Sequence, residues 1–340
     1  MLREISKNCQ DDIENEGDGE EGEDDLEFDE GPASLEEYID IERMERAVVH
    51  YFRAHPPANP DEVADTIENH FLQMEADEIV GEARRERWSD TEEAQELMFR
   101  MMGMSLDSDL DEMAALARKA LALDPDNADA GTFIATYACN DLGEIAARLR
   151  DVVARAERVL GPDIQENMGC LWTNALARPY MRTRYTLMST LRHAQRWDEA
   201  IAEAKAMLEL NEDDEQEVGT VLLGLYLASG DTRAARGIMK EYIEQDSALY
   251  EWAAVLEKLL SGNKSGATKA LATAMHNNPH AAEFLLDSKS IVEANALSDE
   301  SEIIEEALDC VERLGYAWLA HPEAFDWLVT AAGKGKPRRD

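Results

Sequence analysis

Three alanines mark a repeat that limits the chain to one kind of architecture. Ala200, Ala235 and Ala267 lie 35 and 32 residues apart, and each follows a turn by a few residues within an amphipathic helical pattern. An earlier amphipathic stretch, 110–127, runs into Asp-Pro, as the second helix of a pair should. Two antiparallel helices approach closely only where one of them presents a small residue at the crossing. Small residues at this interval therefore predict helices packed in successive pairs.

Strand patterns are scarce, which favours an all-α fold. Few runs alternate β-branched and polar residues, and no Asn-Gly or Asp-Gly turn joins two such runs. Helix starts are frequent instead: Ser34 opens a capping box, and Asn59 precedes Pro60 at a first helical position. Paired helices with a period of about 34 residues resemble the tetratricopeptide repeat. We therefore expect a tetratricopeptide-like α-solenoid of antiparallel helix pairs.

Composition and pattern divide the chain into five segments. Residues 8–30 hold 13 acids and no base, so they have too few apolar groups to offset the entropy lost on ordering. We expect a disordered tail there, which serves as a solubilising leader, a tether for a basic partner or a mask for the arginines described below. The predicted segments are an acidic tail at 1–33, an N-terminal helical segment at 34–92, repeats at 93–286 with an insertion at 163–180, a C-terminal helical cap at 287–332 and a basic tail at 333–340.

The charge balance limits the classes of partner. The chain has 73 acidic and 33 basic residues and a formal net charge of −40. This charge repels nucleic acid and anionic membranes and leaves open a basic partner. No apolar run approaches the ~20 residues needed to span a bilayer, and the N-terminal sequence does not resemble a signal peptide. We therefore expect a cytoplasmic protein that binds neither nucleic acid nor membrane.

Patterns typical of catalysis or metal binding are not evident. The four cysteines, Cys9, Cys139, Cys170 and Cys310, are scattered without a CxxC pair, which argues against a zinc or thioredoxin-type site. Phosphate-binding loops and hydrolase nucleophile motifs are not found either. The sequence thus favours a protein that is not an enzyme and uses no metal and no cofactor.

Arginines gather in one window that excludes carboxylates. No Asp or Glu occurs between Glu166 and Asp198. In a tetratricopeptide array the first helices of successive repeats line a concave groove, and positions 182, 185, 189, 192 and 193 share one face of such a helix. The following first helices would add Gly224, Trp252 and Leu256 to the groove. The candidate partner-binding residues are Arg178, Arg182, Tyr185, Ser189, Arg192, His193 and Trp252.

Two roles are open for these arginines. As a basic centre beside an apolar wall, Arg182 and Arg192 would hold an acidic segment or a C-terminal carboxylate, since a guanidinium can bind a carboxylate in bidentate geometry. Alternatively, Arg178 and Arg184 pair with carboxylates on adjacent helices and only orient the insertion.

Several strings together are similar to one known family. They occur at 116–130, 178–191, 199–211, 277–286 and 302–328, and include Arg-Pro-Tyr-Met-Arg and Asn-Pro-His. They resemble the suppression-of-tumorigenicity-seven family and its bacterial tetratricopeptide relatives. The resemblance implies a helical-repeat role in protein interaction and supplies no catalytic residue. Vertebrate members look membrane-associated, a trait that does not transfer to a chain without an apolar span.

The leading interpretation is a protein- or peptide-binding adaptor. The alternative is an acidic mimic of nucleic acid that occupies a basic DNA-binding protein. The sequence names neither the partner nor the oligomeric state.

Overall fold

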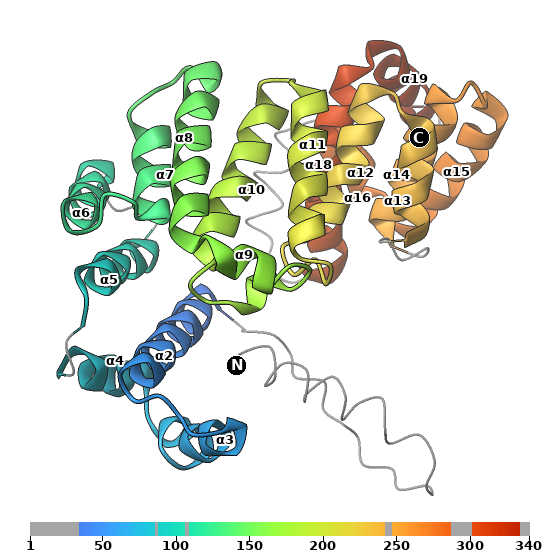
Figure 1. The fold of residues 1–340 in the computed structure, drawn as a ribbon. Coiled ribbons are helices and arrows are strands. Elements are labelled where there is room, and N and C mark those ends of the chain that lie inside the picture. Colours follow the sequence, from blue (N-terminus) through green and yellow to red (C-terminus); the bar gives the residue numbers. More distant parts are fainter. Residues whose placement is uncertain (1–33, 86–87, 106–108, 242–246, 287–300, 334–340) are drawn as a thin grey trace, which may run out of the picture. The chain divides into compact units, whose positions relative to one another are not determined.

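A computed structural model describes residues 34–85, 88–105, 109–241, 247–286 and 301–333, and within these ranges the regular elements are all helices (Figure 1). The predicted all-α fold is confirmed for this part of the chain. The acidic tail at 1–33 and residues 334–340 lie outside the described residues. The chain divides into two compact units, residues 1–186 and 187–340.

The first unit begins with helices that start where the sequence predicts. The Ser34 hydroxyl accepts a hydrogen bond from the backbone N–H of Glu37, and the Asn59 side chain caps the next helix, with Pro60 in its first turn. Such caps satisfy backbone donors that the helix leaves unpaired. Its helices are α2 (Leu35–Ala54), α3 (Pro60–Asn69), η1 (Phe71–Gln73), α4 (Ala76–Arg85), α5 (Asp90–Met102), α6 (Leu110–Leu123), α7 (Ala128–Tyr137), α8 (Leu142–Leu160), α9 (Pro162–Glu166), η2 (Leu171–Thr173) and the start of α10 (Arg178–His193).

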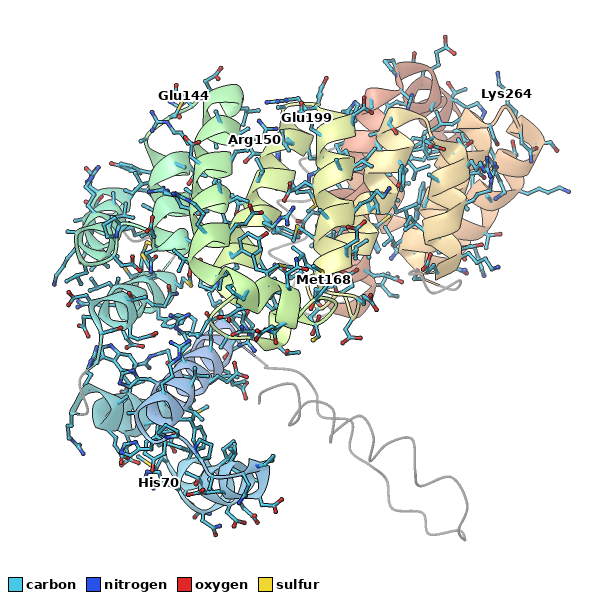
Figure 2. All side chains as sticks on the ribbon, in the orientation of Figure 1. His70, Glu144, Arg150, Met168, Glu199 and Lys264 are labelled. Carbon is cyan, nitrogen blue, oxygen red and sulfur yellow. The ribbon has the colours of Figure 1, made fainter. Side chains whose placement is uncertain are left out.

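Helices α5 to α8 pack in chain order, each against the next. On α6 the residues Ala114, Ala117 and Ala120 are completely buried, and this stripe of small side chains lets the neighbouring helices approach. Met98 and Met101 of α5 fill the same core. Charged side chains such as Glu144 on α8 are exposed (Figure 2). The small stripe of α6 lets the helices approach, and the large side chains of α5 fill the space beside it.

The second unit contains the three alanines from which the sequence predicts a repeat. Ala200, Ala235 and Ala267 lie on α11, α13 and α15, and each is completely buried. Helix α12 packs on α11 and α13, and α14 packs on α15, so the alanines occupy tight helix contacts. The helices are α11 (Trp197–Leu210), α12 (Val218–Ser229), α13 (Thr232–Glu241), α14 (Ala248–Leu260), α15 (Lys264–Asn277), α16 (His280–Leu286), α18 (Ser301–Ala320) and α19 (Pro322–Gly333).

Helix α18 packs against α12 and α14, which are distant from it in the sequence, and against α16, which is closer in the sequence (Figure 1). Its inner side is apolar: Leu314 and Trp318 are completely buried. The Tyr316 hydroxyl donates a hydrogen bond to the carbonyl of Val221 at 3.0 Å, which joins α18 to the first turn of α12. This helix covers the faces of α12 and α14 that the sequence assigned to an open groove.

Candidate functional site

Arg182, the predicted centre of the groove, is held by two buried carboxylates of the first unit. Its guanidinium donates to both oxygens of Glu42, at 2.6 and 3.0 Å, and to both oxygens of Asp129, at 3.0 and 2.6 Å. The side chains of Glu42 and Asp129 are 0% and 5% exposed. A guanidinium that is bidentate to two carboxylates has little donor capacity left for a partner.

The same polar network extends through four helices of the first unit. The Gln95 amide donates to Asp129 at 2.7 Å and accepts from Asn127 at 3.0 Å. Arg46 of α2 donates to Glu92 of α5 at 3.1 Å and to the carbonyl of Ala175 at 3.3 Å. These partners lie far apart in the sequence, so helical periodicity could not have indicated them.

Burial and charge act in opposite directions on these groups. Burial alone would raise the pKa of Asp129, but the charge and hydrogen bonds of Arg182 and the Gln95 hydrogen bond outweigh it, and the pKa lies below its ordinary value. Burial lowers the pKa of Arg182, whereas Asp129 and Glu42 raise it well above its ordinary value. Both groups therefore stay charged at neutral pH, and the cluster is an internal charge network.

Arg178 and Arg184 are also engaged within the first unit, and Arg178 pairs with a carboxylate of another helix, as the alternative interpretation proposed for both arginines. Arg178 is buried, forms an ion pair with Glu45 at 2.6 Å and donates to the carbonyl of Trp172 at 2.9 Å. Arg184 donates to the hydroxyl of Tyr180 at 2.9 Å. Tyr185 is half-buried on the same helix.

The predicted residues of the second unit are not gathered around an open apolar wall. Trp252 is completely buried, and its ring N–H donates to the carbonyl of Asn278 at 3.3 Å. The guanidinium of Arg192 lies over the ring of Tyr316, 5.0 Å from its centroid, and one of its N–H groups lies 3.5 Å from the Ser189 hydroxyl. His193 is exposed, with Nδ1 2.7 Å from the carbonyl of Ser189.

The expectation that Trp252 forms a groove wall is therefore wrong, and the reason is α18. A Cβ atom added at Gly224 would lie 2.2 Å from the carbonyl oxygen of Arg313 and 2.3 Å from the hydroxyl of Tyr316. Leu256, another predicted groove position, is completely buried. Helix α18 of the same chain packs on both α12 and α14, the helices that carry these predicted groove positions.

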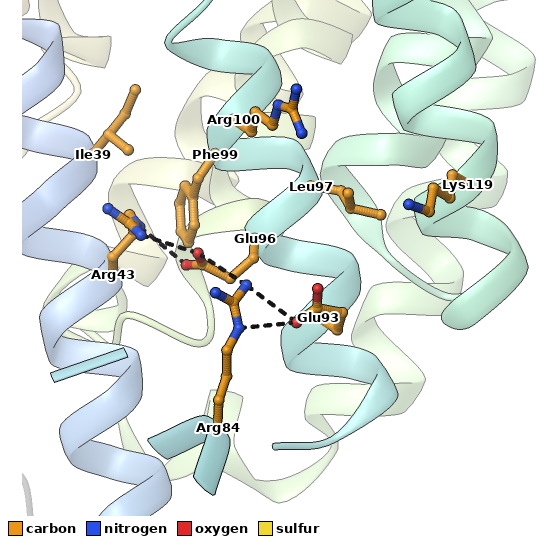
Figure 3. Close-up of a pocket in the computed structure, with 9 residues that line it drawn as sticks. All are labelled: Ile39, Arg43, Arg84, Glu93, Glu96, Leu97, Phe99, Arg100 and Lys119. Carbon is orange, nitrogen blue, oxygen red and sulfur yellow. Dashed lines mark hydrogen bonds and ion pairs between the residues drawn. The ribbon is translucent and has the colours of Figure 1, made fainter. Parts of the chain in front are cut away.

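A pocket with four cations opens in the first unit, away from the arginine window (Figure 3). Its volume is 480 Å³, and α2, α4, α5 and α6 line it. We call it the basic pocket. Its cations are Arg43, Arg84, Arg100 and Lys119.

Two of the four cations are neutralised inside the pocket. Arg43 donates to both oxygens of Glu96, each at 3.1 Å, and Arg84 lies 3.2 Å from Glu93 (Figure 3). Arg43 also binds Asp40 and Asp77. These ion pairs fix the side chains of the pocket wall and neutralise the positive charge of Arg43 and Arg84.

The other two cations have no such neutralising groups. Arg100 and Lys119 are exposed, and neither forms an ion pair or hydrogen bond with any residue that the structure describes. Leu97 lies in the wall with them. The sequence gives a weak signal for this pair, since Arg100 and Lys119 belong to different helices and neither stands in an arginine-rich window.

Within the described ranges, no group of three or more His, Cys, Asp or Glu side chains is arranged to hold a metal ion. None of the helices described is both long and apolar enough to cross a bilayer.

Comparison with known proteins finds no family model that matches the chain and no curated protein that matches it.

Proposed function

We propose that this chain is a helical-repeat adaptor that binds an acidic segment of a partner protein in the basic pocket. The observation that supports it is the pair Arg100 and Lys119, two exposed cations beside Leu97 that no described carboxylate neutralises. The partner-binding role is the one implied by the tetratricopeptide and suppression-of-tumorigenicity-seven resemblance. The site differs from the one expected, because Arg182 is engaged with Glu42 and Asp129.

The chemistry of the pocket favours a short acidic segment over a longer polyanion. Arg100 can donate two parallel hydrogen bonds to one carboxylate, and Lys119 can bind a second. A net charge of −40 would repel an extended nucleic acid from the rest of the surface. Because Arg43 and Arg84 are already paired, a partner that brings a few carboxylates and an apolar side chain fits best.

The test uses a fluorescent peptide of alternating Glu and Leu as the probe. We expect the probe to bind the full chain at low salt and to lose at least tenfold in affinity with the double variant Arg100→Glu/Lys119→Glu, because two attractive charges become repulsive. The matched control is Arg53→Glu/Arg158→Glu, which changes the net charge equally at two exposed positions outside the pocket. Equal loss in both variants would show a general charge effect and contradict the proposal.

A further inference from the structure

We infer that the chain's own acidic segment, residues 20–30, occupies the basic pocket when no partner is bound. This inference rests on the proposed function of the pocket and adds regulation to it. Eight of these 11 residues are Asp or Glu, and the pocket holds the two exposed cations Arg100 and Lys119. The two features have complementary charge within a chain that is otherwise strongly acidic.

The segment is attached next to the pocket. Residues 31–34 alone separate it from α2, which begins at Leu35, and the pocket wall starts on that helix at Ile39 and Arg43. Four extended residues span at most about 14 Å, and four residues of helix add about 6 Å. A tether of this length gives an effective concentration in the millimolar range, so a contact with a dissociation constant below about 1 mM would be occupied most of the time.

The segment also offers apolar side chains. Leu26 and Phe28 stand within the acidic run Asp24–Glu30, and an extended backbone places residues two apart on the same side. Leu97, in the pocket wall with Arg100 and Lys119, provides an apolar surface for them. Charge brings the segment to the pocket, and apolar contact distinguishes this site from other cations on the surface.

A self-docked segment would compete with a partner. Binding of an external acidic peptide must displace the tail, so its apparent affinity falls in proportion to the fraction of pockets that the tail leaves free. The attraction is between solvent-exposed charges and is screened over about 10 Å at 0.1 M salt. Salt screens the tail contact and the partner contact alike, so the effect of the tail on partner binding is measured by comparing wild type with a tail variant at one low ionic strength.

A zero-length carbodiimide cross-link tests the docking directly in the full chain. This reagent joins a lysine amine to a carboxylate in contact with it, and the monomer band is digested and analysed by mass spectrometry. We expect a link between Lys119 and a carboxylate within 20–30 at low salt, and its loss in 0.5 M NaCl, a concentration at which screening is several-fold shorter in range than at low salt. Lys119→Arg keeps the charge but removes the amine, so this link should disappear while others remain. Absence of the link in the wild-type monomer would overturn the inference.

Probe binding separates the inference from the proposed function. The full-length variant with Asp24, Asp25, Glu27, Asp29 and Glu30 changed to their amides should bind the Glu-Leu probe about tenfold more tightly than the wild type, the factor given when the effective concentration of the tail is about ten times its dissociation constant. Equal affinity would overturn self-docking and leave the proposed function standing. No binding to either protein, with the Lys119 link present, would overturn the proposed function and leave self-docking standing.

Discussion

Two helices of 20 residues, α2 in the first unit and α18 in the second, are each held against several other helices, but by opposite chemistry. Helix α2 is held by buried charges: its Glu42 binds Arg182, and its Arg46 binds Glu92. Helix α18 is held by close approach, with its backbone at Arg313 against Gly224 of α12. Each unit therefore depends on a different kind of fit.

The two kinds of fit fail in different ways. A buried charge network is stable while every member is paired, and removal of one member leaves a charge in a poorly solvated place. A close backbone contact such as that at Gly224 has no room for one more carbon atom, whatever the charge of the Arg313–Glu217 pair beside it. The first unit should thus respond to charge and pH, and the second to volume.

The largest effect is expected from Arg182→Ala in the first unit. This change leaves the carboxylates of Glu42 and Asp129 buried without their cation. Breaking a buried pair in this way destabilises a protein by about 3–5 kcal/mol, to be measured by urea unfolding. Arg196→Ala is the control, because Arg196 pairs with Glu199 at the surface, and its melting temperature should not change measurably. A mild effect of Arg182→Ala would return that arginine to the list of partner-binding residues.

A somewhat smaller effect is expected from Gly224→Ala in the second unit. The new methyl group would meet the Arg313 carbonyl at 2.2 Å, and backbone cannot move aside without displacing α18. Overpacking of this kind costs about 1–3 kcal/mol, and the upper end is expected here. Gly237→Ala on α13 is the matched control, since a Cβ there meets nothing within 4 Å. It should stabilise the helix by about 0.5–1 kcal/mol. If both variants melt together, the contact between α12 and α18 is looser than described.

Acid should destabilise the buried charge network of the first unit and leave the close contact at Gly224 in the second unit unchanged. The pKa of Asp129 is held below its ordinary value, so its contribution to stability is complete above a pH of about 4 and is lost as the pH falls through the lower folded value. Glu45 acts with the opposite sign, because burial raises its pKa, which Arg178 only partly offsets. We therefore expect the stability difference between wild type and Asp129→Asn to shrink below pH 4.

Urea unfolding at a series of pH values measures this difference. The cost of Gly224→Ala provides the internal reference, and it should stay constant over the same range, since the new Cβ meets a backbone carbonyl and the Tyr316 hydroxyl, neither of which changes its charge in acid. A stability difference for Asp129→Asn that does not change with pH would show that Asp129 is not charged in the folded protein.

The smallest effect is expected from Arg100→Ala and Lys119→Ala. Both side chains are exposed and unpaired within the described part of the chain, and surface substitutions of this kind usually change stability by less than about 0.5 kcal/mol. Thermal melts would check this. Substitution of Arg100 should then affect only binding, whereas substitution of Arg182 in the same unit should affect only stability. A large loss of stability in Arg100→Ala would place that residue in the structural network as well.

Local patterns were enough to predict the helices and their tight contacts. The caps at Ser34 and Asn59 and the buried alanines Ala200, Ala235 and Ala267 follow from propensity and spacing along a short stretch of chain. The acid-free window was also visible, and the alternative interpretation correctly expected some of its arginines to pair with neighbouring helices. These features are local, so one sequence contains all the information that they need.

What covers each helix face was decided by tertiary structure alone. The partners of Arg182 lie 140 and 53 residues away in the sequence, at Glu42 and Asp129, and no periodic pattern links them. Trp252 is on the predicted face but is completely buried, because α18 folds back onto α12 and α14. Helical spacing specifies which side chains share a face, whereas the element that packs on that face depends on contacts between segments far apart in the chain. For the same reason Arg100 and Lys119 became a candidate site only when α5 and α6 were placed side by side.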